Sequence, residues 1–222
     1  MKVRAILNPR AGVAARAALD AVKRTGTPWG ELDLKVTTAE QTHALGAALA
    51  GVLRAGDLLV LTGELGAGKT TFTQGLGEGL GVREGIISPT FVLVRIHPNL
   101  PDGPNPGGPD LVHVDAYRLG SASEIDDIDL ENTLDSSVTV VEWGRGRVEH
   151  LSDSRLEVEL HRSLGSSLGG GSPANGTPGS GPPGVLDFDV EDDDEPRTII
   201  IRGFGPRWAD QPDLNLASEG IS

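Results

Sequence analysis

The stretch Gly63-Glu64-Leu65-Gly66-Ala67-Gly68-Lys69-Thr70-Thr71 decides the fold class that this sequence predicts. It fits the phosphate-binding loop (P-loop) pattern, in which a glycine and four further residues precede Gly-Lys-Thr. Glycines at these positions let successive backbone N–H groups turn inward around an anion. Lys69 is then expected to reach the β and γ phosphates of a nucleotide, and the Thr70 hydroxyl to complete the coordination shell of Mg²⁺. The stretch therefore predicts that the chain binds a nucleoside triphosphate.

The residues on both sides of this loop support the prediction. Before it, Asp57–Thr62 is a short apolar run of the kind that forms a strand buried on both faces. After it, Thr70–Leu80 places Phe72, Leu76 and Leu80 four residues apart, as on one face of a helix. Strand, loop and helix is the required order, because the helix directs the positive end of its dipole at the anion. The alternative is a glycine-rich turn that merely resembles the pattern. Such a turn would not require a buried strand before it and a helix after it.

Composition limits the class of protein. At 222 residues the chain supports one domain with appendages, and its 31 glycines and 15 prolines indicate long irregular stretches. It has no cysteine, which excludes disulfides and thiolate metal sites and fits a cytoplasmic location. No apolar run approaches the roughly 20 residues that cross a bilayer, and no signal peptide is evident, so we expect no membrane association. The net charge of −13 argues against a broad basic surface for nucleic acid, so a partner is expected to hold any RNA involved.

Two segments are predicted to be flexible inserts. Residues 97–110 are rich in proline and glycine, and they separate the predicted strands Phe91–Ile96 and Leu111–Asp115, which we expect to form an extended hairpin. Residues 163–196 are rich in glycine, serine and proline and then acidic. We expect this second insert to be disordered, because it cannot bury enough apolar area to offset chain entropy.

The second insert lies between two further predicted strands. Arg155–Leu160 and Arg197–Ile201 are apolar runs that we expect to pair as a hairpin. The acidic run Glu191–Glu195 just before the second strand is interpreted as a solvated spacer, with a docking site for a basic partner as the alternative.

Two acidic residues end predicted buried strands. Asp115 follows Leu111–Val114, and Glu142 follows the apolar run Val138–Val141. P-loop enzymes place an acidic residue at the end of a neighbouring strand, next to Mg²⁺. We therefore predict that Asp115, Glu142 and Lys69 are catalytic. One of the two acids is expected to support the metal or its water shell, and the other to orient the attacking water or to respond to the γ-phosphate.

Four motifs in order resemble the TsaE (YjeE) family, small bacterial ATPases of the tRNA threonylcarbamoyladenosine pathway. They are the P-loop, Ser88-Pro89-Thr90-Phe91, then His113-Val114-Asp115-Ala116-Tyr117-Arg118-Leu119, and finally Val141-Glu142-Trp143. The resemblance covers about residues 34–160 and resumes near Arg197. It implies an α/β fold: a single P-loop NTPase domain with a mixed central sheet flanked by helices.

The resemblance also implies roles for individual residues. Thr70 and Glu142 match the family's magnesium positions, and Thr90 lies in a switch-like loop where it would respond to the γ-phosphate; a proline-stiffened connection is the alternative. Glu40, just before the predicted helix Gln41–Leu53, matches a nucleotide-contacting position, although an acid there also suits a helix dipole. The predicted nucleotide contacts of the P-loop are Glu64, Leu65, Gly66, Ala67, Gly68, Lys69, Thr70 and Thr71.

Several neighbours of these motifs have alternative interpretations. Trp143 is interpreted as core filling, or else as packing on a partner or on switch residues. His113 is expected to be a hydrogen-bonded core histidine. Arg118 is a candidate for a phosphate contact or for pairing with an acid among residues 124–127. The arginines Arg145 and Arg147 are either nucleotide contacts or ordinary surface charges.

The mechanism that follows is hydrolysis of Mg²⁺-bound ATP to ADP by in-line attack of water. Because no arginine finger is evident, we expect hydrolysis to be slow without a partner. The resemblance implies that this partner is the TsaD–TsaB threonylcarbamoyl transferase complex, with tRNA engaged only indirectly. A P-loop small-molecule kinase and a nucleotide-dependent switch without required hydrolysis are the alternatives.

The first thirty residues depart from the family. Lys2–Leu7 is predicted to be a strand, Asn8–Gly12 a turn and Ala14–Lys23 a helix. This opening is similar to the start of diacylglycerol-kinase-type lipid kinases, but nothing later is. We interpret residues 1–30 as an extension, or as the result of a misassigned start codon. The P-loop ATPase domain is then expected over residues 31–202, with a tail over residues 203–222.

Overall fold

The structure is a computed structural model that describes residues 2–6, 31–126, 128–162, 196–212 and 214. Its strands are β1 (Lys2–Ile6), β2 (Glu31–Val36), β3 (Leu58–Gly63), β4 (Val94–His97), β5 (Asp110–Asp115), β6 (Ser137–Glu142), β7 (Arg155–Arg162) and β8 (Arg197–Phe204). Its helices are α2 (Ala39–Ala50), α3 (Lys69–Leu80), α4 (Ala122–Asp126) and α5 (Glu131–Leu134), with 3₁₀ turns η1 (Glu149–Leu151) and η2 (Pro206–Trp208).

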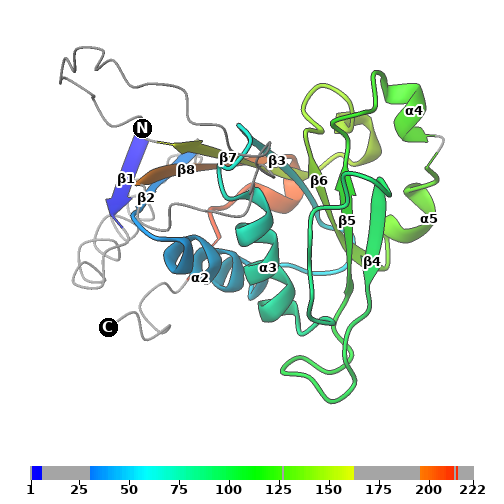
Figure 1. The fold of residues 1–222 in the computed structure, drawn as a ribbon, viewed down its shortest axis with the longest axis horizontal. Coiled ribbons are helices and arrows are strands. Elements are labelled where there is room, and N and C mark those ends of the chain that lie inside the picture. The colour runs from blue at the N-terminus through cyan, green and yellow to red at the C-terminus, as the bar shows by residue number, and fades with distance from the viewer. Residues whose placement is uncertain (1, 7–30, 127, 163–195, 213, 215–222) are drawn as a thin grey trace, which may run out of the picture.

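The strands form one mixed sheet, as the sequence predicts. Within the described ranges its order is β1-β2-β8-β7-β3-β6-β5-β4. The central strands β7, β3, β6 and β5 run parallel to one another, whereas β8 and β4 are antiparallel to their neighbours. Helices α2 and α3 lie side by side along one face of the sheet (Figure 1). Buried residues of α4 and α5 pack in a second apolar cluster with residues of β3, β5 and β6. The predicted α/β fold class is therefore confirmed.

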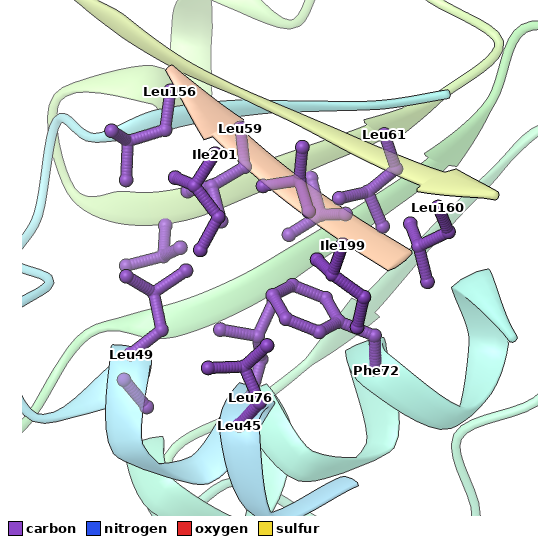
Figure 2. Packing of buried hydrophobic residues seen from close by; sticks show 14 of the residues in the cluster. Leu45, Leu49, Leu59, Leu61, Phe72, Leu76, Leu156, Leu160, Ile199 and Ile201 are labelled. Atoms are coloured by element: carbon purple, nitrogen blue, oxygen red, sulfur yellow. The ribbon is translucent and has the colours of Figure 1, made fainter. Parts of the chain in front are cut away.

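Buried apolar side chains join α2 and α3 to the sheet. Those of β3, β7 and β8 point toward the two helices (Figure 2). The labelled members of this cluster are Leu45, Leu49, Leu59, Leu61, Phe72, Leu76, Leu156, Leu160, Ile199 and Ile201. The helices approach closely because glycines face the partner backbone: a Cβ on Gly75 would lie 1.9 Å from the His43 carbonyl oxygen. This packing fixes where the N-terminus of α3 meets the sheet.

The two predicted hairpins form, but one begins later than predicted. Strands β7 and β8 pair antiparallel, and so do β4 and β5. The prediction that a strand begins at Phe91 is wrong, because the amides of Val92 and Leu93 both donate to the Pro89 carbonyl and close a turn. Leu93 has a φ of 65°, which a strand does not accommodate.

The first predicted insert is irregular and contacts helix α3. Its first residue, His97, and its last, Asp110, belong to strands β4 and β5, so the irregular part is shorter than predicted. The Asn99 side-chain amide donates to the carbonyls of Leu80 and Asn105 at 2.9 Å each. These bonds satisfy a carbonyl at the C-terminal end of α3, which the helix itself leaves unpaired.

Helix α2 differs in its bounds from the predicted Gln41–Leu53. It begins at Ala39, because the Thr38 hydroxyl accepts from the Gln41 amide and caps the helix. It ends at Ala50, with Gly51 as the C-cap. Glu40 is therefore inside the first turn and not before the helix.

The N-terminal strand β1 extends the sheet by pairing in parallel with β2. The turn and the helix predicted within residues 8–23 lie outside the described residues, as does the second insert up to residue 195. Among the helices in the described part of the chain, none is both long enough and apolar enough to span a bilayer.

Candidate nucleotide-binding site

Three parallel strands end at one edge of the sheet and bring the predicted acids to the P-loop. Strand β3 leads into the loop at Gly63, β6 ends at Glu142 and β5 ends at Asp115. The register pairs Glu142 with Leu61 on one side and with Asp115 on the other. Both carboxylates are buried, with 3% of each residue exposed. Parallel α/β sheets bind ligands at this edge.

The loop has the backbone geometry that an anion-binding loop needs. Gly66 and Gly68 have φ of 75° and 95°, which glycine adopts without the penalty of a Cβ. The Ala67 amide donates to the Glu64 carbonyl at 3.2 Å and closes the turn. Gly68 is the N-cap of α3 and provides no side-chain cap, so the first amides of α3 are left for an anion.

Lys69 lies at the centre of the site. Its ammonium donates to the carbonyls of Gly63 and Glu64, at 2.9 Å each. Burial lowers the pKa of Lys69, and the negative charges of Glu142 and Asp115 oppose this shift. The ammonium is therefore held between the loop backbone and the two acids.

Trp143 covers this lysine. The Lys69 ammonium lies 4.3 Å from the centre of the Trp143 ring, a cation–π contact, and Tyr117 packs edge-on against the same ring at 5.3 Å. The interpretation of Trp143 as core filling is wrong, because the residue is only half-buried and is absent from both apolar clusters. Trp143 follows the last residue of β6 with a φ of 61°, and this turn directs its ring over the loop.

Glu142 is hydrogen-bonded to His113. The distance from His113 Nε2 to Glu142 Oε1 is 2.8 Å, and both side chains are buried. This confirms the prediction of a hydrogen-bonded core histidine. The sequence does not indicate that its partner is the candidate metal ligand.

Asp115 is bonded to the predicted switch loop. The Thr90 hydroxyl donates to Asp115 Oδ2 at 2.6 Å, and the Tyr117 amide donates to Oδ1 at 2.9 Å. The Ser88 and Thr90 hydroxyls are 2.7 Å apart. The predicted γ-phosphate response of Thr90 stays a prediction, and the structure adds the residue through which it would act.

Three arginines named from the sequence have other partners. Arg145 pairs with Glu157 and Glu159 on β7. Arg147 donates to the Ala116 carbonyl at 2.6 Å. Arg118 lies over the Phe91 ring, 5.1 Å from its centre.

Arg197 is a candidate that sequence reasoning missed. It opens strand β8 and is buried, with 4% of the residue exposed, and within the described part of the chain its Nε and Nη1 have no hydrogen-bond partner. A Cβ on Gly68 would lie 3.7 Å from Arg197 Nε, so the guanidinium adjoins the P-loop. The predicted hairpin could have indicated Arg197. Strand β7 runs parallel to β3, so the first residue of its antiparallel partner β8 lies at the same edge of the sheet as the P-loop.

Glu40 is placed in the first turn of α2, near the loop but exposed. A hydrogen bond from its own backbone amide and one from Thr38 lower the pKa of Glu40. Two residues on, the Thr42 methyl would lie 3.5 Å from a Cβ on Gly68, so this turn adjoins the P-loop. The predicted nucleotide contact of Glu40 stays a prediction.

Comparison with known proteins identifies the family. A sequence profile described as "Threonylcarbamoyl adenosine biosynthesis protein TsaE" matches residues 36–167. The chain belongs to the TsaE family. The role of this family is tRNA threonylcarbamoyladenosine biosynthesis.

Individual TsaE proteins and one solved structure agree. The TsaE protein of Streptomyces coelicolor is 48% identical over 166 residues, which cover 74% of this chain and 92% of that protein. The Bacillus subtilis TsaE protein is 36% identical over 134 residues, 60% of this chain and 79% of its own length. The crystal structure of Bacillus subtilis YdiB superposes with a TM-score of 0.53 at 27% identity, covering 80% of this chain and 88% of YdiB.

Proposed function

We propose that this TsaE-family chain binds ATP with Mg²⁺ and hydrolyses it slowly, and that hydrolysis supports tRNA threonylcarbamoyladenosine synthesis by a TsaD–TsaB transferase complex. The observation that carries the proposal is the position of Lys69, between the glycine loop and the two buried acids Asp115 and Glu142. An ammonium, inward amides and a helix N-terminus together match a polyphosphate.

The chain's own groups would bind the phosphates by exchanging partners. Lys69 would release the carbonyls of Gly63 and Glu64 and donate to the β and γ phosphates. The amides from Gly66 to Thr71 would donate to the same anion. Because Lys69 already lies between the loop backbone and two buried acids, the site is pre-organised for a charged ligand.

The donor set fits Mg²⁺ held jointly by protein and nucleotide. Thr70 and Glu142 would hold the ion, which would neutralise negative charge that develops on the phosphates during transfer. Among the described residues there is no group of three or more His, Cys, Asp or Glu that could hold a metal alone. Mg²⁺ usually binds through one or two carboxylates plus substrate phosphates, so a larger group is not required.

Asp115 is the better placed of the two acids to act on the switch loop. Its hydrogen bond to Thr90 couples residue 90 to the end of β5. We assign Glu142 to the metal and Asp115 to positioning Thr90 or the attacking water.

Arg197 is expected to contact the phosphates. Its substitution should therefore weaken ATP binding without lowering the stability of the nucleotide-free protein. Arg197→Met should weaken ATP binding about tenfold to a hundredfold, the effect of one charge-assisted hydrogen bond. The same change should leave the melting temperature of the nucleotide-free protein equal or higher, because it removes a buried cation whose Nε and Nη1 have no hydrogen-bond partner among the described residues. Calorimetry with ATP and thermal unfolding measure the two effects.

The control for this prediction is Arg202→Met on the same strand. Arg202 pairs with Glu31 and Glu159, so its loss should lower stability and leave ATP affinity unchanged. If Arg197→Met binds ATP with the same affinity as wild type, Arg197 does not contact the nucleotide and its assignment to the site is wrong.

Exposed apolar and aromatic side chains around the site favour contact with a partner protein. Leu65, Phe91 and Tyr117 are exposed by 81%, 85% and 63%, although all three are large and apolar or aromatic. Exposed apolar groups beside a nucleotide site are typical of a protein contact. The TsaD–TsaB complex is the partner that the family role suggests.

The test is ATP hydrolysis with and without a purified TsaD–TsaB complex. We expect slow turnover alone and stimulation by the complex, because a partner can supply charge to the transition state. Transfer of the γ-phosphate to a metabolite would indicate a kinase instead. Support of tRNA modification by a non-hydrolysable ATP analogue at full rate would indicate a switch that needs no hydrolysis.

A further inference from the structure

We propose that His113 is a positioning residue that orients Glu142 toward the metal. This inference rests on the proposed function, because it takes Glu142 as a Mg²⁺ ligand. The hydrogen bond of the His113 side chain is to Glu142, so His113 would act through this carboxylate.

The sheet register brings the two side chains together. His113 pairs with Val140, and Glu142 pairs with Asp115, so the histidine and the glutamate are diagonal neighbours on adjacent parallel strands. They lie on the sheet face that packs against α3, because Val140 and the Glu142 partner Leu61 belong to that apolar cluster. The histidine is thus directed to the face that carries Lys69.

The hydrogen bond restricts an otherwise adaptable carboxylate. A carboxylate accepts, so the hydrogen on His113 Nε2 points at Glu142 Oε1 over 2.8 Å. This leaves the second oxygen, Oε2, for the metal. The other ring nitrogen, Nδ1, is buried and has no hydrogen-bond partner among the residues that the structure describes. Within the described residues, the ring is therefore hydrogen-bonded to Glu142 alone, and hydrogen-bonded partners of this kind orient metal ligands.

The experiment measures the Mg²⁺ concentration that half-maximally tightens binding of the non-hydrolysable analogue AMP-PNP, by calorimetry on the full chain. His113→Leu should raise this concentration about 10- to 100-fold, the usual effect of removing a partner behind a metal ligand. AMP-PNP affinity without Mg²⁺ should not change. A purely structural role would lower the melting temperature without moving the Mg²⁺ requirement.

The matched control is His97→Leu. His97 is a second buried histidine, on the neighbouring strand β4, and its Nε2 has no hydrogen-bond partner in the described ranges. The same substitution there should leave the Mg²⁺ requirement at the wild-type value. A rise equal to that of His113→Leu would show that loss of any buried histidine perturbs the site, and would overturn the proposal.

Two further variants keep the proposal testable if His113→Leu does not fold. In His113→Gln the amide N–H₂ can replace Nε2–H, whereas in His113→Asn it occupies the place of Nδ1 and cannot reach Glu142. We expect a near-normal Mg²⁺ requirement for glutamine and a raised one for asparagine. Equal requirements for the two would contradict the proposal.

A double-mutant cycle separates this inference from the proposed function. In a Glu142→Gln background, replacing His113 should raise the Mg²⁺ requirement no further, because the residue acts through Glu142. A full additional rise there overturns the inference alone. If Mg²⁺ does not tighten AMP-PNP binding to the wild-type chain, it is the proposed function that fails.

Discussion

Lys69→Ala is expected to abolish nucleotide binding by this chain. The ammonium would donate charge-assisted hydrogen bonds to two phosphates, each contributing about 1.5–3 kcal/mol. Their loss weakens ATP binding by at least about 100-fold. The substitution also leaves the carbonyls of Gly63 and Glu64 without their present donor and uncovers the Trp143 ring.

Calorimetry with Mg²⁺ and ATP checks this result, and Arg83→Ala is the matched control. Arg83 is an exposed cation beyond the C-terminal end of α3, the end opposite the P-loop. Arg83→Ala removes the same positive charge as Lys69→Ala but far from the P-loop, so the ATP affinity of this variant should equal that of wild type. Wild-type affinity in a folded Lys69→Ala variant would show that the assigned site is wrong.

Glu142→Gln is expected to abolish most of the hydrolysis and much less of the binding. The change removes the charge on the proposed metal ligand while keeping its size and one carbonyl oxygen. Groups that stabilise transition-state charge are worth about 100- to 1,000-fold in turnover, and we expect a loss in this range. Binding depends chiefly on the loop and Lys69, so ATP affinity at high Mg²⁺ should fall far less.

Steady-state turnover at saturating Mg²⁺-ATP, with the TsaD–TsaB complex present, measures this loss. Glu157→Gln is the control, because Glu157 is also a buried strand acid but pairs with Val60 on the opposite face of the sheet. Glu157→Gln should lower the stability of the protein, because it weakens the ion pairs with Arg145 and Arg155, and it should leave turnover unchanged. A Glu142→Gln variant with wild-type turnover would exclude the metal-ligand role.

Much of the fold follows from local pattern. The apolar runs before the P-loop and before Glu142 form buried parallel strands, and the helix after the loop buries Phe72, Leu76 and Leu80 as its spacing predicts. These predictions succeed because period and turn chemistry are properties of neighbouring residues. The strand predicted to begin at Phe91 is wrong because a turn anchored on Pro89 competes with it.

The predicted acids lie together for a topological reason. Because β3, β6 and β5 run parallel, their C-terminal ends lie at one edge, so Asp115 and Glu142 had to adjoin the P-loop once those strands paired. The glycines needed no tertiary context either, since their backbone conformations suit the loop by themselves.

By itself, therefore, the sequence determined the loop, the strands that flank it and the two acids at their ends. Only the tertiary structure decided that His113 bonds Glu142, that Trp143 covers Lys69 and that Arg197 adjoins Gly68. Each of these contacts joins residues from separate strands or loops, and its geometry depends on register and on how closely α3 packs on the sheet. No spacing along the chain encodes those distances, because they arise only when distant segments meet in the folded core.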